Sequence, residues 1–462
     1  MPCRSNCAHG SDASDAVTVF RCEYAWVDGG VRPSIDIAVV DGRIASVGPV
    51  DHAVRDEVVE LAGVVLPGFA NAHSHAFHRA LRGRSHADGG TFWTWRDQMY
   101  RAASVLTPDL YYALARAVYG EMVVAGVTCV GEFHYVHHTA DGSPYADPNA
   151  MGEALRAAAR DAGLRLTLLD TCYLAGGLDA SGSLPLRADQ LRFSDGNATA
   201  WAQRVSLLSD DATTRIGAAV HSVRAVPRDQ IAIVAQWANG RPLHAHLSEQ
   251  LGENEACEAA YGVTPTQLLA QVGVLGANAT MVHATHLTNG DVALIGASRT
   301  FSCFCPTTER DLADGIGPAM QLAQAGSPLC LGSDQHAVID LLEEARALEM
   351  HERLVHHERG RFRPDELVTA LSAAGHRSLG WNDVGVLAIG QRADLVAVRL
   401  DTVRTAGSAP EQVLLAAFAA DVGTVVVDGN VVVANGVHRS IDVATELAES
   451  IGDVWRQVEE QR

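Results

Sequence analysis

Two histidines placed two residues apart follow an apolar run near the start of the chain. They are His73 and His75, at the end of "LPGFANAHSH". Alternate side chains of an extended strand point to the same side, so both imidazoles can reach one ion. The pair alone is weak evidence, because 20 histidines in 462 residues produce such pairs by chance. The rest of a metal site has to come from elsewhere in the sequence.

Two further candidate ligands end later apolar runs. His246 lies in "HAHLSEQ" and Asp334 in "LGSD", which gives a set of three imidazoles and one carboxylate. This set suits one divalent metal ion, zinc first and iron as the alternative, with a position left open for water. We therefore expect a catalytic centre in which the ion makes water nucleophilic.

Three side chains near these positions are candidates for moving protons. Glu249 follows His246 by three residues, close enough to shuttle a proton without binding the ion. His283, in "MVHATHL", would orient the water or polarise the substrate, and Asp334 would bind the ion and accept a proton. The alternatives are a first-turn helix carboxylate for Glu249 and a hydrogen-bonded core histidine for His283. Two other acidic residues after the seventh apolar run are expected only to cap that loop, namely Glu309 and Asp314.

The elements that position these residues lie between 66 and 384. Eight short apolar runs alternate there with segments of helical period, which predicts an α/β fold, a TIM-like (β/α)8 barrel. The C-terminal ends of barrel strands converge on one face, so residues far apart in the sequence can share a site. The predicted helices are 107–125, 149–162, 199–209, 228–239, 264–273, 289–297, 316–325 and 341–358.

Both ends of the chain have a different pattern. Val-rich runs with Asp-Gly turns occupy 17–65 and 385–440, which predicts antiparallel hairpins that meet as one composite β-sandwich. Residues 1–16 lack an apolar core and are expected to form a flexible tail rather than a signal peptide. A C-terminal helix is expected over 441–462.

Composition excludes several functions. A net charge of −20 argues against nucleic-acid binding, and no apolar window is long enough for a membrane span. Nine scattered cysteines favour a reducing cytoplasm. The chain has no lysine, which rules out Schiff-base chemistry and a carboxylated lysine bridging two metals. An anionic substrate would need arginines placed locally to offset the overall charge.

The motifs "LPGFANAHSH", "HAHLSEQ", "MVHATHL" and "LGSD" together resemble the amidohydrolase superfamily, in particular its mononuclear deaminase branch. The resemblance covers nearly the whole chain, and "GQRADLVAV" is similar to the point where such enzymes re-enter their small sandwich. It implies a one-metal barrel enzyme, in agreement with the missing lysine.

A closer resemblance is to the formimidoylglutamate deiminase family of histidine degradation, carried by "FWTWRDQMYR", "GEFHYVHH" and "HSVRAVP". It implies hydrolysis of N-formimidoyl-L-glutamate, a small anionic substrate derived from an amino acid, to N-formyl-L-glutamate and ammonia by a homodimer. The implied substrate-binding residues are Arg96, Tyr135, His221 and Arg224. His78 stands where that family has Gln, which places this contact and its selectivity in question.

Three other functions fit parts of the same pattern. Another deaminase of the superfamily would act on guanine, another purine or pyrimidine, or a guanidino compound. A hydrolase of cyclic amides could use the same metal set. A barrel that has lost its metal could bind ligands without catalysis, although all four ligand positions here are chemically competent.

Overall fold

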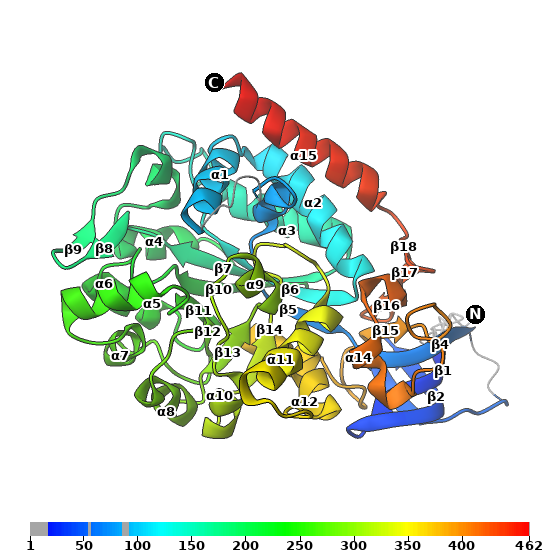
Figure 1. Ribbon diagram of the computed structural model, residues 1–462. Coiled ribbons are helices and arrows are strands. Elements are labelled where there is room, and N and C mark those ends of the chain that lie inside the picture. The colour runs from blue at the N-terminus through cyan, green and yellow to red at the C-terminus, as the bar shows by residue number, and fades with distance from the viewer. Residues whose placement is uncertain (1–16, 54–56, 86–91, 462) are drawn as a thin grey trace, which may run out of the picture.

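The computed structural model describes residues 17–53, 57–85 and 92–461 (Figure 1). The tail predicted over 1–16 lies outside the described residues. The centre of the fold is a sheet of eight parallel strands in the order β14-β13-β12-β11-β10-β7-β6-β5. These strands are β5 (Phe69–Ser74), β6 (Val127–His134), β7 (Arg165–Cys172), β10 (Thr214–Val220), β11 (Leu243–Leu247), β12 (Ala279–His283), β13 (Phe301–Phe304) and β14 (Leu329–Leu331).

The two edge strands of this sheet meet, which closes it into a barrel. Ser74 and Asp334 form a parallel bridge, and the backbone N–H of Asp334 donates to the carbonyl of His73 over 3.0 Å. Each of the eight strands overlaps one of the eight apolar runs of the sequence. The predicted fold class is therefore confirmed, and its closing seam runs through two of the candidate metal ligands.

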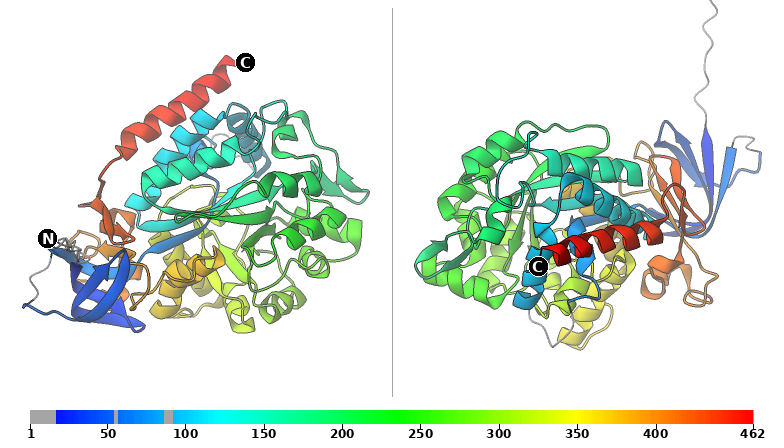
Figure 2. Two further views of the ribbon diagram at one scale, coloured as in Figure 1. Left: turned by 180° about the vertical axis from the view of Figure 1, so that it is seen from behind. Right: turned by 90° about the horizontal axis from the view of Figure 1, so that it is seen from above.

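Helices surround the barrel (Figures 1 and 2). The predicted helices correspond to α2 (Pro108–Val124), α3 (Ala150–Ala162), α4 (Ala198–Val205), α5 (Arg228–Trp237), α7 (Pro265–Gln271), α8 (Asn289–Ala297), α10 (Ala319–Ala325) and α11 (Leu341–His356). Local sequence explains their ends: Thr107 caps α2 by accepting from the N–H of Leu110, and Gly163 ends α3 in the left-handed conformation.

Several helices were not predicted from the sequence. They are α1 (Phe92–Ser104), α6 (Leu251–Tyr261), α9 (Pro306–Asp311), α12 (Pro364–Thr369), α13 (Gly375–Ser378) and α14 (Val413–Ala416). Most are short, and short helices depend on tertiary packing rather than on their own periodicity. Two of them matter for function, because α1 and α6 follow strands β5 and β11, which carry candidate ligands.

The ends of the chain form a second, separate sheet in the order β18-β17-β16-β15-β4-β1-β2-β3. Its strands are β1 (Thr18–Val27), β2 (Gly30–Val40), β3 (Arg43–Pro49), β4 (Glu57–Pro67), β15 (Leu395–Val398), β16 (Val422–Val427), β17 (Asn430–Ala434) and β18 (Val437–His438). The halves join where β4 pairs with β15, and one core contains Phe20 and Ile37 from the first half and Leu395 and Val426 from the second.

One detail of this sheet differs from the expected antiparallel hairpins. Strand β4 pairs with β1 in parallel, because the chain completes the β1-β2-β3 meander and then crosses to the other side of β1. The sheet is also curved, so that its edge strand β3 approaches the segment before β15. The N–H of Ile44 in β3 donates to the carbonyl of Gln391 in that segment.

The C-terminal helix α15 (Val443–Glu460) lies along α2 on the outside of the barrel (Figure 1). Arg116 of α2 forms an ion pair with Glu446, and the indole N–H of Trp455 donates to the carbonyl of Ala80 over 2.8 Å. Ala80 belongs to the short 3-10 helix η1 (Ala76–Leu81) that follows β5. Among the described residues, no helix combines the length and apolar character that a membrane crossing requires.

Candidate metal centre and active site

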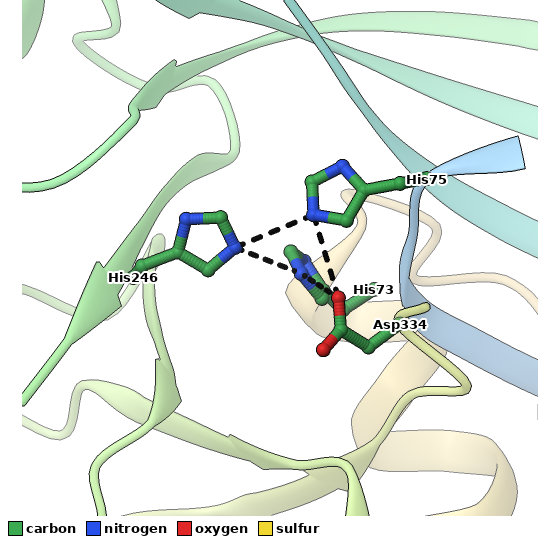
Figure 3. Close-up of side chains that lie close together, drawn as sticks. All are labelled: His73, His75, His246 and Asp334. Carbon is green, nitrogen blue, oxygen red and sulfur yellow. Dashed lines mark hydrogen bonds and ion pairs between the residues drawn. The ribbon is translucent and has the colours of Figure 1, made fainter. Parts of the chain in front are cut away.

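Four side chains from three strand ends converge on one point at the barrel mouth (Figure 3). His73 and His75 come from β5 and its end, His246 from β11, and Asp334 from the loop after β14. The Nε2 atom of His246 lies 3.1 Å from Nε2 of His73 and 3.4 Å from Nε2 of His75. Oδ1 of Asp334 lies 3.3 Å from His73 Nε2 and 3.4 Å from His75 Nε2. All four side chains are buried, and we call them the tetrad.

Backbone carbonyls hold two of these imidazoles with Nε2 toward the centre. Nδ1 of His75 donates to the carbonyl of Phe133 over 3.0 Å, and Nδ1 of His246 donates to that of His221 over 2.8 Å. A carbonyl oxygen only accepts, so each Nδ1 carries the proton and each Nε2 presents a lone pair. Burial lowers the pKa of His75 to about 3, which keeps the ring neutral.

The residues of the tetrad fit a divalent cation. The lone pairs of His75 and His246 face each other across 3.4 Å, an arrangement that is repulsive unless a cation lies between them. Tetrahedral coordination with metal–nitrogen distances of ~2.0–2.1 Å places ligand atoms roughly 3.4 Å apart. The observed neighbouring separations run from 3.1 to 3.4 Å. Three nitrogens and one oxygen are donors that zinc accepts and that iron tolerates.

The predicted proton-transferring residues adjoin the tetrad. Nε2 of His283 lies 3.7 Å from Oδ2 of Asp334 and 3.8 Å from Oε1 of Glu249. Burial disfavours a charged His283, but the carboxylates of Glu249, Glu309 and Asp334 outweigh burial and raise its pKa to about 10. Burial also raises the pKa of Glu249. His283 and Glu249 therefore lie next to each other beside the tetrad, and His283 also lies near the tetrad's carboxylate, Asp334.

The two acidic residues expected only to cap the loop after β13 have other contacts. Oε1 of Glu309 accepts from the N–H of Cys305 over 2.8 Å, as a cap does, but it also lies 3.5 Å from Nδ1 of His283. Asp314 accepts a hydrogen bond from the side chain of Gln250, and burial raises its pKa to about 9. The capping assignment is thus incomplete for Glu309 and wrong for Asp314. Sequence spacing carried no signal for either contact, because both depend on how neighbouring loops meet.

A cavity of about 270 Å³ opens beside this centre, and three predicted substrate-binding residues line it. Arg96 comes from α1, and His221 and Arg224 come from the loop after β10. Two guanidinium groups therefore line one small cavity, together with Glu253, in a protein whose net charge is −20.

Glu253, which the sequence did not single out, holds Arg224 in place. Nε of Arg224 donates to Oε2 of Glu253 over 2.6 Å, while Oε1 of Glu253 accepts from the N–H of Ser248 over 2.9 Å. Nη2 of Arg224 lies 3.6 Å from Oε2 of Glu249. Glu253 thereby ties the arginine to the strand end that carries the metal ligand His246.

The other two predicted substrate-binding residues lie between the tetrad and the cavity. Nε2 of His78 and the hydroxyl of Tyr135 are 2.8 Å apart, and both side chains are buried. The ring of His78 lies 4.5 Å from that of His75, and the ring of Tyr135 lies 5.5 Å from that of His221. This pair therefore connects the metal centre with the cavity.

A second group of potential metal ligands has a different arrangement. Ligand atoms of His134, His137 and Asp170 lie within 4.8 Å of one another. Arg204 already donates to both oxygens of Asp170, over 2.9 and 2.8 Å, and also to Asp195 over 2.8 Å. A guanidinium thus occupies the position that a cation would need, and the group is explained as a buried ion-pair network.

Comparisons with known proteins agree with this geometry. The sequence profile of the amidohydrolase family matches residues 64–432. The chain is 38% identical over 369 residues to a formimidoylglutamate deiminase from Pseudomonas aeruginosa, which covers 77% of this chain and 80% of that protein. It is also 29% identical to a 5-methylthioadenosine/S-adenosylhomocysteine deaminase from Pelotomaculum thermopropionicum, over 91% of this chain and 93% of that protein.

A solved structure shows the same architecture over nearly the full length. It is an amidohydrolase from Brucella melitensis with a TM-score of 0.86 and 30% identity, covering 95% of this chain and 100% of that chain. The profile match spans the barrel, the tetrad and strands of the second sheet on both sides. This chain therefore belongs to the amidohydrolase family and is a hydrolase that acts on carbon–nitrogen bonds.

Proposed function

We propose that this protein is an N-formimidoyl-L-glutamate deiminase that releases ammonia and N-formyl-L-glutamate. The observation that carries the proposal is the placement of Arg96 and Arg224 in one cavity with His221, beside Glu249 and the tetrad. The identity to a formimidoylglutamate deiminase over most of both chains supports the same substrate.

Charge is the reason why the cavity favours a dicarboxylate. The substrate carries two carboxylates, and each guanidinium can bind one of them through paired N–H groups. Glu253 occupies the Nε of Arg224, which leaves other N–H groups of that guanidinium for the ligand. A neutral purine or pyrimidine has no carboxylate to accept the paired N–H groups of either guanidinium, so it would gain neither of these charge-assisted contacts.

The residues around the tetrad account for the proton transfers. A divalent ion held there would supply Lewis acidity, which lowers the pKa of water near the formimidoyl carbon. Glu249 accepts one proton of the attacking water and returns it to the formimidoyl nitrogen. Asp334, with His283 beside it, accepts the second proton and passes it on to the same nitrogen. The bond between the carbon and the terminal nitrogen then breaks, so that the C=NH group and one water become the carbonyl oxygen of the N-formyl amide and ammonia.

Tyr135, His78 and His221 are proposed to hold the formimidoyl end of the substrate. They lie between the tetrad and the two arginines, where the uncharged part of a bound substrate would be. His78 keeps a polar ring nitrogen within reach of Tyr135, so it replaces the family's Gln with a group that also forms hydrogen bonds.

Further parts of the proposal concern the state of the protein. We propose zinc as the metal, with iron as the alternative, and a homodimer that works in the cytoplasm within histidine degradation. The set of three imidazoles and one carboxylate supports zinc. Metal analysis of the purified protein identifies the bound ion directly.

The decisive experiment is turnover by metal-loaded protein with identification of the organic product. Ammonia release from N-formimidoyl-L-glutamate, together with N-formyl-L-glutamate detected by mass spectrometry, is the expected result. Guanine and 5-methylthioadenosine are the comparison substrates, since a deaminase of the latter is also a relative. Turnover of either comparison substrate, with none of the formimidoyl compound, would replace this proposal with a nucleobase or nucleoside deaminase.

A further inference from the structure

Two tyrosine hydroxyls and one buried amide form a small polar group in the wall of the cavity. The hydroxyl oxygens of Tyr100 and Tyr173 lie 3.4 Å apart. Nε2 of Gln190, in the 3-10 helix η2 (Ala188–Phe193), lies 3.0 Å from each of them. Tyr100 and Tyr173 both line the cavity that contains Arg96 and Arg224.

The orientation of Gln190 follows from its other contact. Its Oε1 accepts from the backbone N–H of Arg187 over 2.9 Å, so the oxygen faces the backbone and the NH2 group faces the tyrosines. Each of the two hydrogens of that NH2 group is then donated to one tyrosine hydroxyl. Gln190 is fully buried, which keeps water from competing for these bonds.

The hydrogen bonds among Gln190 and the two tyrosines leave one hydroxyl hydrogen without an acceptor. Both hydroxyls accept from Gln190, and one of them donates to the other across 3.4 Å. The hydroxyl that accepts twice still has its own hydrogen, and no described residue accepts it. A buried donor without an acceptor is unfavourable, so that hydrogen is directed at whatever fills the cavity.

Either hydroxyl can donate to the other, so the spare hydrogen can belong to either tyrosine. Tyr173 is the tyrosine beside the predicted substrate-binding residue His221, because their rings lie 4.5 Å apart. The ring of Tyr100 instead lies under the guanidinium groups of Arg96 and Arg187, at 5.6 and 4.9 Å. Burial raises the pKa of Tyr173 well above its ordinary value, so the phenol keeps its proton at neutral pH. The ligand that meets it must present an acceptor and suit the neighbouring cations, as a carboxylate does.

We propose that the hydroxyl of Tyr173, oriented by Gln190 and Tyr100, donates a hydrogen bond to a carboxylate oxygen of the substrate beside Arg96 and Arg224. This inference rests on the proposed function for the substrate's identity. It adds a substrate-binding residue, Tyr173, and two positioning residues. It also supplies a reason for dicarboxylate selectivity, because a neutral heterocycle that cannot accept there would leave this donor unpaired.

The test compares Tyr173→Phe with Tyr100→Phe in the metal-loaded protein. Tyr173→Phe removes the donor and is expected to raise KM for N-formimidoyl-L-glutamate about 10-fold or more, with kcat within about twofold, since a hydrogen bond to a charged group is lost. Tyr100→Phe leaves the Tyr173 proton in place and is expected to change KM by less than about threefold. Tyr112→Phe is the matched control, because its hydroxyl bonds Asp161 outside the cavity.

Calorimetric binding of the product N-formyl-L-glutamate gives a second readout that does not depend on turnover. The dissociation constant is expected to rise in Tyr173→Phe by the same factor as KM, with metal content unchanged. Equal KM and equal product affinity in wild type and Tyr173→Phe would overturn the inference, as would the larger effect appearing in Tyr100→Phe. If the wild type binds N-formyl-L-glutamate but does not turn over the formimidoyl compound, the proposed function fails while the binding comparison still decides the role of Tyr173.

Discussion

The Nε2 atoms of His73 and His246 lie 3.1 Å apart although they belong to the first and fifth strands of the barrel. His246 presents a lone pair at this point because its Nδ1 donates to the carbonyl of His221. The barrel strands hold the two rings in place, and a cation bound by both Nε2 atoms would make the close approach favourable.

The first prediction concerns the tetrad. His246→Ala removes one ligand of four, so bound metal should fall to well below one ion per chain. Activity should fall by more than the ~10–100-fold that follows loss of an outer contact to a metal ligand. Atomic absorption and ammonia release measure the two effects. His52→Ala, an exposed histidine, is the control and should retain both. Full metal content in His246→Ala would remove this residue from the site.

The second prediction separates substrate binding from metal binding. Arg224→Ala removes a cavity cation and should raise KM by about 10- to 100-fold, while metal content stays at one ion per chain. Steady-state kinetics and metal analysis check this together. Arg228→Ala, four residues later and exposed, serves as control. Loss of metal from a folded Arg224→Ala protein would show that the arginine supports the tetrad instead.

The third prediction tests Glu253, whose two oxygens bridge Arg224 and the N–H of Ser248. Glu253→Gln keeps the size but weakens both bonds and lets the guanidinium turn. KM should rise about 10-fold and kcat should change less. The exposed Glu255→Gln, on the same helix, should leave KM unchanged. An unaltered KM in folded Glu253→Gln protein would mean that Arg224 needs no such support.

The fourth prediction concerns acid stability away from the active site. Burial alone would raise the pKa of Asp170 and Asp195, but Arg204 and neighbouring histidines outweigh it and lower both. Because the folded pKa values lie below the unfolded value of ~3.9, the stabilisation is present at neutral pH and is lost as pH falls below about 4.

Arg204→Met takes the guanidinium away from two buried carboxylates and should cost about 3–5 kcal/mol at pH 7. The unfolding midpoints of wild type and variant, followed by circular dichroism, should therefore differ most at pH 7 and converge toward pH 3. A difference that stays constant over this range would mean that the carboxylates do not titrate differently in the folded state.

Much of the fold could be predicted from the sequence because the signals are local. The eight barrel strands are short apolar runs, and their order along the chain fixes which strand ends share a face. The parallel pairing of β1 with β4 could not be predicted, since the same Val-rich pattern suits either direction. Helix α1, which carries Arg96 and Tyr100, was missed although its motif was recognised.

By itself, the sequence determined which residue types stand at which strand ends, and this identified the tetrad candidates and Glu249. It also showed that the chain contains no lysine. Only the tertiary structure decided that Glu253 holds Arg224, that Glu309 touches His283 and that Gln190 orients two tyrosines. The physical reason is that a strand end projects its side chains by a fixed alternation along one strand. A contact between loops instead depends on how the elements that carry them pack around the barrel.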